Sequence, residues 1–293
     1  MTEEENPGMT TTPPATGPQR GPLDQVSFDE QAGEVFDARA GFPPGVAERI
    51  AGALLHYAGV DPGDLIVEVG AGTGLIGQWL ARSPARYLGL DRSQPMLDSF
   101  APRLPAGDRA SLRQADADQP WPVADGTARV VFGSRVFQLL DPDHLIREAF
   151  RVGCPDRAVL VQGRLERRPD SPKVLLRRQL HERLRAHGLT PRPAGKLLQQ
   201  LLQRAAAAGG TLLPPVTVAA WPHPVKPDDV LDEWRQKYSM GGVTPPADVS
   251  ERILDELAGW VAETFGEPAE TVTTEESYVL EGVQLRPPKE SYE

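Results

Sequence analysis

A short apolar run that leads straight into a glycine-rich turn constrains the fold of this chain more than any other feature. Residues 65–69 read Leu-Ile-Val-Glu-Val, and residues 70–74 read Gly-Ala-Gly-Thr-Gly. The first segment is short, apolar and rich in β-branched residues, which predicts a buried strand. The glycines permit a tight turn and let a ligand approach the backbone, and a helix that begins behind them presents free N–H groups. A glycine turn that holds no ligand is the alternative interpretation.

Strand and helix signals alternate after this turn, and one more helix is expected before it, at 46–57. Such alternation is typical of a parallel sheet that helices cover on both faces, so we predict an α/β fold. Further strands are expected at 87–90, 112–115, 128–132, 158–161, 215–221 and 271–285, and further helices at 75–80, 93–100, 144–150, 171–188, 194–208, 227–238 and 247–265.

The net charge of the chain limits the kinds of molecule that it is expected to bind. The net charge of the 293 residues is −10, which argues against nucleic acid as a partner, because such binding needs clustered positive charge. Residues 166–225 are the exception, with ten basic and three acidic residues. The first residues, Met-Thr-Glu-Glu-Glu, lack the features of a secretory signal. No segment approaches the roughly 18 apolar residues of a membrane span, so a cytoplasmic location is expected.

Acidic residues lie within or directly after the first three expected strands. Glu68 interrupts the apolar run, where a buried carboxylate needs a hydrogen-bond donor or a cation nearby. Asp91 ends the second strand, where it can accept hydrogen bonds from ribose hydroxyls, and Asp116 follows the third, where it can accept one from an adenine amino group. These positions favour a nucleoside ligand with a sulfonium group over a dinucleotide, although Gly72–Gly77 also fits the dinucleotide fingerprint. Simpler roles stay open: Asp91 as a cap for the helix at Ser93, and Asp116 as a loop acid.

Three segments, Glu68–Gly74, Asp91–Leu97 and Gln114–Ala117, resemble the motifs of the class I S-adenosylmethionine-dependent methyltransferases. The resemblance is closest to the small-molecule group that includes the ubiquinone and menaquinone methyltransferases, and it covers residues 28–165 well. It implies a Rossmann-like sheet of seven strands, mostly parallel, with the last strand antiparallel. It also implies S-adenosylmethionine as the cofactor, held by Glu68, Gly70, Ala71, Gly72, Thr73, Gly74, Asp91, Arg92, Met96, Asp116, Ala117 and Ser134.

The resemblance implies methyl transfer by SN2 displacement to a small-molecule acceptor. Many relatives carry a histidine after the fourth strand, whereas residues 134–138 here read Ser-Arg-Val-Phe-Gln. No general base is evident there, so we assign no catalytic residue and expect catalysis to depend on holding the two reactants in line. One cysteine and five scattered histidines predict no metal site. Candidate substrate-binding residues are Phe36, Arg135, Gln138, His181 and Trp221.

The expected organisation divides the chain into five parts. These are a disordered tail (1–25), a cofactor-binding core with an N-terminal lid (26–165), a helical cap insertion (166–212), the remainder of the core (213–286) and a second tail (287–293). The lid is implied by a segment, Phe28–Asp37, similar to the one that covers the cofactor in the family.

The basic helices of the expected cap have four interpretations. They can attract an anionic acceptor, contact an anionic membrane surface, pair with acidic segments of this chain, or form a solvated arginine face. The acceptor itself is expected to be apolar or anionic. Two other functions stay open, a nicotinamide-dependent reductase and a non-catalytic sensor or scaffold that keeps the cofactor pocket. The sequence does not indicate the oligomeric state.

Overall fold

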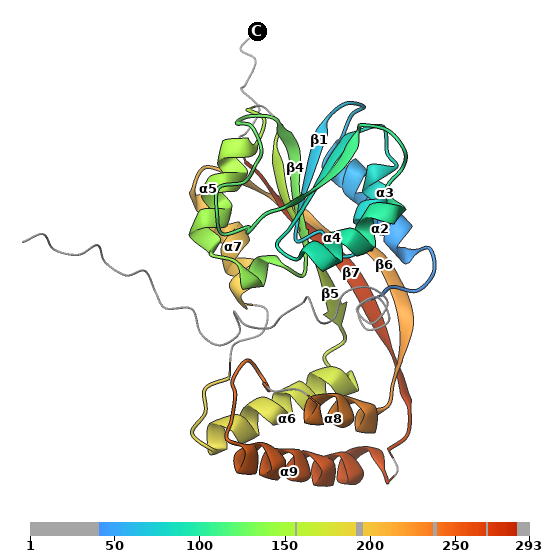
Figure 1. The fold of residues 1–293 in the computed structure, drawn as a ribbon. Helices are drawn as coiled ribbons and strands as arrows, with labels where there is room; N and C mark the ends of the chain where they lie inside the picture. The colour runs from blue at the N-terminus through green and yellow to red at the C-terminus, as the bar shows by residue number, and fades with distance from the viewer. Residues whose placement is uncertain (1–40, 156, 192–195, 237–238, 268, 286–293) are drawn as a thin grey trace, which may run out of the picture.

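A seven-stranded sheet with the order β3-β2-β1-β4-β5-β7-β6 forms the centre of the molecule (Figure 1). The computed structural model describes residues 41–155, 157–191, 196–236, 239–267 and 269–285. Strands β1 to β5 are parallel, and β7 is antiparallel to both of its neighbours, which confirms the predicted fold class. The strands are β1 (Leu65–Val69), β2 (Arg86–Asp91), β3 (Ala110–Gln114), β4 (Ala128–Ser134), β5 (Val159–Arg167), β6 (Thr211–Val225) and β7 (Val272–Gln284).

The parallel strands end along one edge of the sheet. Asp91 at the end of β2 is in register with Gln114 at the end of β3, and Glu68 of β1 is in register with Phe132 of β4. In an open parallel sheet, ligands bind outside the carboxyl ends of the strands, where the strand order reverses. The order reverses here between β1 and β4, next to the turn at 70–74.

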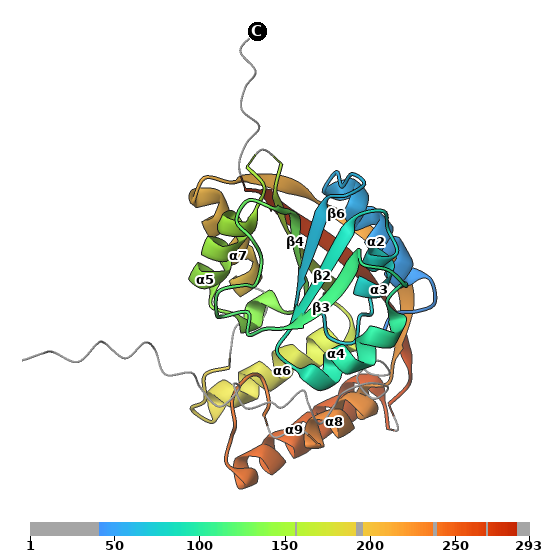
Figure 2. The same cartoon turned by 45° about the horizontal axis from the view of Figure 1, so that its top comes forward.

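Helices cover both faces of the sheet (Figure 2). On one face, Ile50 and Leu54 share an apolar cluster with Phe132 of the sheet. On the other face, Leu145 and Leu201 share a cluster with several strand residues. The sheet and the helices on its two faces are therefore held together by one buried cluster on each face. The helices of the first face are α2 (Val46–Tyr57), α3 (Gly77–Ala81) and α4 (Gln94–Phe100), and those of the second are α5 (Pro142–Val152) and α7 (Lys196–Ala207).

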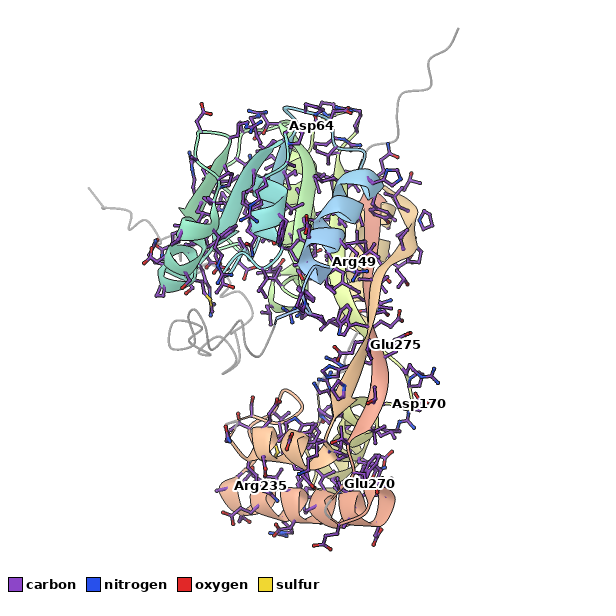
Figure 3. All side chains as sticks on the ribbon, turned by 90° about the vertical axis from the view of Figure 1, so that its right-hand side faces the viewer. Arg49, Asp64, Asp170, Arg235, Glu270 and Glu275 are labelled. Carbon is purple, nitrogen blue, oxygen red and sulfur yellow. The ribbon has the colours of Figure 1, made fainter. Side chains whose placement is uncertain are left out.

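Three further helices form a separate layer opposite the carboxyl edge of the sheet (Figure 1). They are α6 (Pro172–Ala186), α8 (Pro227–Arg235) and α9 (Ala247–Phe265). Their contact is an apolar cluster of its own, with Leu176 and Leu257 fully buried. The extended ends of β6 and β7 join this layer to the sheet as a narrow neck, where Asp170 and Glu275 lie (Figure 3).

The structure distributes the helices differently from the expected cap at 166–212. Only α6 of that segment belongs to the helical layer, while Leu201, Leu202 and Ala205 of α7 pack with α5 and Val283 against the sheet. The partners of α6 are instead α8 and α9, from further along the chain. An amphipathic pattern shows that a helix has a buried face, but it does not show what that face packs against.

Local sequence signals account for where the helices begin and end. Ser171 caps α6 by accepting a hydrogen bond from the backbone N–H of Val174, and Pro172 occupies its first turn. Gly188, just after α6, has a φ of 76°, a left-handed conformation that favours glycine after a helix. Among the described residues, no helix combines the length and apolar character needed to cross a membrane.

We expect Leu176→Ala to lower the free energy of unfolding by about 2–5 kcal/mol, because the truncation leaves a cavity in the helical layer. Leu176 is 0% exposed. Equilibrium urea unfolding followed by circular dichroism measures the loss. Leu139→Ala is the control, since Leu139 is 55% exposed, and it should change this free energy by less than about 0.5 kcal/mol. Equal losses in the two variants would show that the helical layer lacks a packed core.

Candidate functional site

The turn at 70–74 depends on three glycines with left-handed backbone conformations. The φ angles of Gly70, Gly72 and Gly74 are 69°, 54° and 79°, a region that other residues occupy only at a cost. A Cβ on Gly70 would lie 2.5 Å from Val136, and one on Gly74 would overlap the ring of Phe100. A Cβ on Gly72 would meet nothing within 4 Å. The middle glycine therefore faces open space, while the outer two are packed against the protein.

The carboxylate of Asp91 is bound to this turn. Its Oδ2 accepts a hydrogen bond from the backbone N–H of Gly72 at 2.8 Å, and its Oδ1 accepts one from the backbone N–H of Ser93 at 2.9 Å. Burial raises the pKa of Asp91, and these hydrogen bonds partly offset the effect. The sequence left open that Asp91 caps the helix that begins at Ser93, and the hydrogen bond from the backbone N–H of Ser93 is a contact of this kind. The remaining lone pairs of the carboxylate are available to a ligand.

Glu68 lies behind the turn, in the interior. Its side chain is 3% exposed, and the hydroxyl of Tyr87 donates a hydrogen bond to Oε2 at 2.5 Å. Burial raises the pKa of Glu68 to about 8, with a smaller contribution in the same direction from Asp91. Glu68 is therefore neutral near pH 7, and Tyr87 is the donor that the sequence required. Gly77 makes room for the pair, because a Cβ there would lie 2.5 Å from Glu68 Oε2.

The loop after β3 forms a compact turn beside Asp91. The carboxylate of Asp116 accepts a hydrogen bond from the backbone N–H of Asp118 at 3.0 Å, and the carbonyl of Ala117 accepts one from Trp121 Nε1 at 2.9 Å. The backbone N–H of Ala115 donates to the carbonyl of Asp91 at 2.9 Å, so the loop is tied to the end of β2. Asp116 is exposed and Ala117 half-buried.

The other predicted cofactor residues differ in their exposure. Arg92 is exposed, whereas Met96, Thr73 and Ala71 are buried. Met96 is 2% exposed, so its side chain belongs to the packed interior of the first turn of α4. Gln114 closes the same edge, with its Nε2 donating to the carbonyl of Arg92 at 3.0 Å.

The segment after β4 lies against the glycine turn. Ser134 Oγ is 2.6 Å from the hydroxyl oxygen of Tyr278, a residue of β7. Arg135 has a φ of 59°, a left-handed conformation that no other non-glycine residue adopts in the part of the chain described here. Backbone conformations of this kind are strained and cluster at functional sites. The exposed Gln138 donates from Nε2 to the carbonyl of Arg135 at 2.5 Å and so closes this turn.

Phe42 brings two of the predicted substrate residues together. Its ring meets the ring of Trp221 edge-on, with 6.0 Å between centroids, and the ring of Tyr278 at 5.5 Å. The guanidinium of Arg135 lies 5.7 Å from the centroid of the same ring. Arg135, Phe42 and Trp221 therefore line one region beside the end of β4.

His181 and Phe36 are not part of this group. His181 lies on α6 in the helical layer, where a Cβ on Gly241 would approach its ring to 3.3 Å. Phe36 and the lid segment Phe28–Asp37 lie outside the described residues.

Sequence reasoning missed Phe42 and Tyr278. Both come from segments far from residues 134–138 in sequence, so no local pattern marks them. The one available signal is Gly163 on β5, where a Cβ would overlap the hydroxyl of Tyr278. A glycine inside a strand indicates a close approach by another group.

Comparisons with known proteins indicate which kind of domain contains the glycine turn. Residues 66–156 match the family model of a methyltransferase domain. By this match, residues 66–156 carry a methyltransferase domain. The match begins in β1 and extends past α5, so it includes the turn, Asp91, Asp116 and Ser134. No protein of curated function matches the sequence.

Solved structures share the fold of the methyltransferase domain at low sequence identity. A candidate methyltransferase from Bacillus halodurans C-125 is 14% identical, with a TM-score of 0.53, covering 80% of this chain and 98% of its own. The YcgJ protein from Bacillus subtilis is 16% identical, with a TM-score of 0.51 and coverages of 80% and 97%. A candidate type II methyltransferase from Anaeromyxobacter dehalogenans is also 16% identical, with a TM-score of 0.51 and coverages of 81% and 97%. These likenesses concern the fold alone.

The cofactor of this domain class, S-adenosylmethionine, fits the residues present. The open space at Gly72 admits a ligand to the backbone, and Asp91 offers acceptor lone pairs beside it. The neutral state of Glu68 also keeps a second negative charge away from the turn. The prediction of this cofactor is confirmed at the level of the domain.

Two alanine substitutions in the turn should lower the free energy of unfolding by different amounts. Gly74→Ala combines left-handed strain with a clash against Phe100, and we expect it to lower the free energy of unfolding by about 3 kcal/mol or more. Gly72→Ala introduces strain alone, which costs about 1 kcal/mol. Urea unfolding of both variants against wild type measures the difference. A loss at Gly72 as large as that at Gly74 would contradict the open space at the middle glycine.

The raised pKa of Glu68 predicts a pH dependence of stability. The folded-state pKa of Glu68, about 8, exceeds the ordinary value of 4.5. The contribution of Glu68 to the free energy of unfolding is therefore fully present below pH 4.5 and is lost as the pH rises toward 8. Glu68→Gln removes the ionisation, so its free energy of unfolding should fall less than that of wild type between pH 5 and pH 8. The difference is on the order of 3 kcal/mol, and urea unfolding at both pH values measures it.

The control for this experiment is Glu275→Gln, which removes an exposed carboxylate from the neck. Its stability should change with pH as that of wild type does. If Glu68→Gln also follows the wild-type profile, Glu68 is ionised in the folded protein and the interpretation of the Tyr87 pair is wrong.

Proposed function

We propose that this protein transfers a methyl group from S-adenosylmethionine to a small-molecule acceptor at the carboxyl edge of the sheet. The observation that carries the proposal is the carboxylate of Asp91, which two backbone N–H groups hold beside the open face of Gly72. In this position Asp91 would accept hydrogen bonds from ribose hydroxyls. The turn at 70–74 would hold the methionine part, and Asp116 with Ala117 the adenine.

The residues of the chain act by positioning. When bound, S-adenosylmethionine supplies an electrophilic methyl carbon for an in-line displacement. Holding two reactants in line contributes on the order of 7–11 kcal/mol to lowering the barrier. Phe42, Trp221 and Arg135 lie beside the end of β4, where they would contact the acceptor. The rings of Phe42 and Trp221 provide an apolar surface and a means of excluding water.

The groups at the end of β4 support a mechanism without a dedicated base. The hydroxyl of Tyr278 lies against Ser134, and burial raises the pKa of Tyr278 well above its ordinary value. This hydroxyl therefore stays protonated at neutral pH, and it is a hydrogen-bond donor rather than a base. We infer that the acceptor atom is already nucleophilic, as in a thiolate, an amine or a stabilised carbanion.

Within the methyltransferases, we infer that the protein is of the small-molecule type, related to the ubiquinone and menaquinone enzymes. The motifs at 68–74, 91–97 and 114–117 support this assignment. The aromatic residues beside Arg135 support an acceptor with an apolar body.

Calorimetric titration with S-adenosylhomocysteine, the demethylated product of the cofactor, tests this proposal. Wild type should bind it, and Asp91→Ala should lose about 100-fold or more in affinity, because the variant removes a charged acceptor at the ribose position. NADPH is titrated as the competing ligand. The proposal fails if wild type binds NADPH in preference, or binds neither compound.

Asp98→Asn is the matched control. Asp98 is exposed on the same helix, α4, where it accepts a hydrogen bond from Gln94 at 2.7 Å. This variant should bind S-adenosylhomocysteine as wild type does. Circular dichroism of Asp91→Ala is compared with that of wild type, since the variant also removes the acceptors for Gly72 and Ser93. An unchanged spectrum assigns the lost affinity to the missing carboxylate.

A further inference from the structure

The helical layer has an apolar core that is separate from the two clusters of the sheet. Its buried members, among them Leu176 and Leu257, all come from residues 176–269, and none of the members that the structure describes belongs to α7. Apolar packing therefore holds α6, α8 and α9 together. The position of this layer relative to the sheet depends on the neck, where β6 and β7 extend toward the helices.

The neck is hollow on one side. Asp170, Thr273 and Glu275 are among the residues that line a space of about 490 Å³ there, and Figure 3 shows Asp170 and Glu275 beside the neck. Successive residues of a strand point to opposite faces, so Glu276 lies on the other side of β7 from Glu275. The contacts that attach α6 to the neck are on the side of Glu276.

On that side, a chain of four polar side chains connects α6 to three strands. Lys173 Nζ, in the first turn of α6, is 3.1 Å from His223 Nε2 of β6. The same ring nitrogen lies 3.6 Å from Glu276 Oε1 of β7, and this oxygen accepts a hydrogen bond from Arg167 Nε of β5 at 2.5 Å. Glu276 is only 4% exposed. The start of α6 is therefore attached to the neck through His223.

The contact between Lys173 and His223 requires a neutral imidazole ring. An ammonium group carries only hydrogen-bond donors, so Nε2 must be the acceptor and the ring proton is on Nδ1. Protonation of Nε2 would place a second cation 3.1 Å from Lys173 Nζ, where like charges repel. The protonated ring would instead form an ion pair with Glu276, which is already 3.6 Å away. His223 can thus pair with α6 or with β7, according to its charge.

The charged groups that face His223 are Lys173 of α6, Glu276 of β7 and Arg167 of β5. Burial lowers the pKa of His223, and Lys173 and Arg167 lower it further, whereas Glu276 acts in the opposite direction. The net effect is a pKa below the ordinary value of 6.5. Because the folded-state pKa is lowered, the contribution of this contact to stability is fully present above pH 6.5 and is lost as the pH falls through the folded-state pKa.

We propose that Lys173, His223, Glu276 and Arg167 form a pH-sensitive clasp between the helical layer and the sheet, closed when His223 is neutral and released when it is protonated. Trp221 lies two residues before His223 on β6, in register with Glu276, and its ring meets that of Phe42. Release of the clasp therefore alters the wall that α6 presents to the carboxyl edge. The inference does not depend on the proposed function, because the clasp consists of side chains of this chain alone.

Titration of the histidine rings, followed by NMR of the full-length protein, tests the charge dependence of the clasp. The signal that His223→Gln removes identifies His223, and the pKa of this residue should lie below 6.5. Lys173→Met should raise that pKa by about 0.5 or more, because it removes a neighbouring positive charge. Arg178→Gln is the matched control, since Arg178 is an exposed cation on the same helix, and it should leave the pKa of His223 unchanged.

Fluorescence energy transfer across the neck tests the release of the helical layer. Cys154→Ser removes the single cysteine of the chain, and Arg49→Cys with Arg235→Cys places dyes on α2 and α8 (Figure 3). The transfer efficiency should differ between pH 7.5 and pH 5.5. His223→Gln should remove this difference, since a glutamine carbonyl accepts a hydrogen bond from Lys173 at both pH values. Lys173→Met should show the low-pH efficiency at both.

The control for the dyes is a second pair within the sheet and its helices, on Arg49→Cys and Arg113→Cys, both exposed positions. Its efficiency should be the same at both pH values, and circular dichroism should show that every variant is folded. The proposal is overturned if transfer across the neck does not change with pH, or changes equally in His223→Gln. A pKa of His223 at or above 6.5, or one that Lys173→Met leaves unchanged, overturns it as well.

Discussion

The two hydrogen bonds of the Asp91 carboxylate hold together the elements on which the site depends. One bond reaches Gly72 in the turn after β1, and the other reaches Ser93 at the start of α4. The carbonyl of the same residue accepts the N–H of Ala115, after β3. Three successive strand ends therefore meet at one residue. The left-handed glycines of the turn make this possible, since only such a backbone brings the N–H of Gly72 to the carboxylate without side chains in the way.

The interior behind the turn explains why a carboxylate can lie in an apolar strand. Glu68 is neutral near pH 7 and accepts a hydrogen bond from Tyr87, so its burial leaves no uncompensated charge. The absence of a side chain at Gly77 leaves the room that both groups occupy. The first turn of α3 can therefore lie close to β1 and β2, which keeps the glycine turn in its position at the sheet edge.

The helical layer gives the carboxyl edge of the sheet a second wall. The long strands β6 and β7 carry α8 and α9 away from the sheet and place them with α6 opposite its edge (Figure 1). This arrangement brings α6 close to the end of β6, where Lys173 Nζ lies 3.1 Å from His223 Nε2. The two walls differ in chemistry, because the sheet contributes a backbone turn and carboxylates, whereas α6 contributes basic side chains.

Local patterns in the sequence were sufficient to predict the alternating strands and helices, the Ser171 cap and the alignment of Glu68, Asp91 and Asp116 at strand ends. They predicted these features because backbone preferences and short-range hydrogen bonds act within a few residues. Only tertiary packing decided that α8 and α9, and not α7, form the helical layer with α6. The same holds for the contacts of Phe42 with Tyr278 and Arg135. An apolar stripe on a helix, or a lone aromatic residue, indicates that a surface will be buried. Its partner depends on contacts between distant segments, and these are settled only when the whole chain packs.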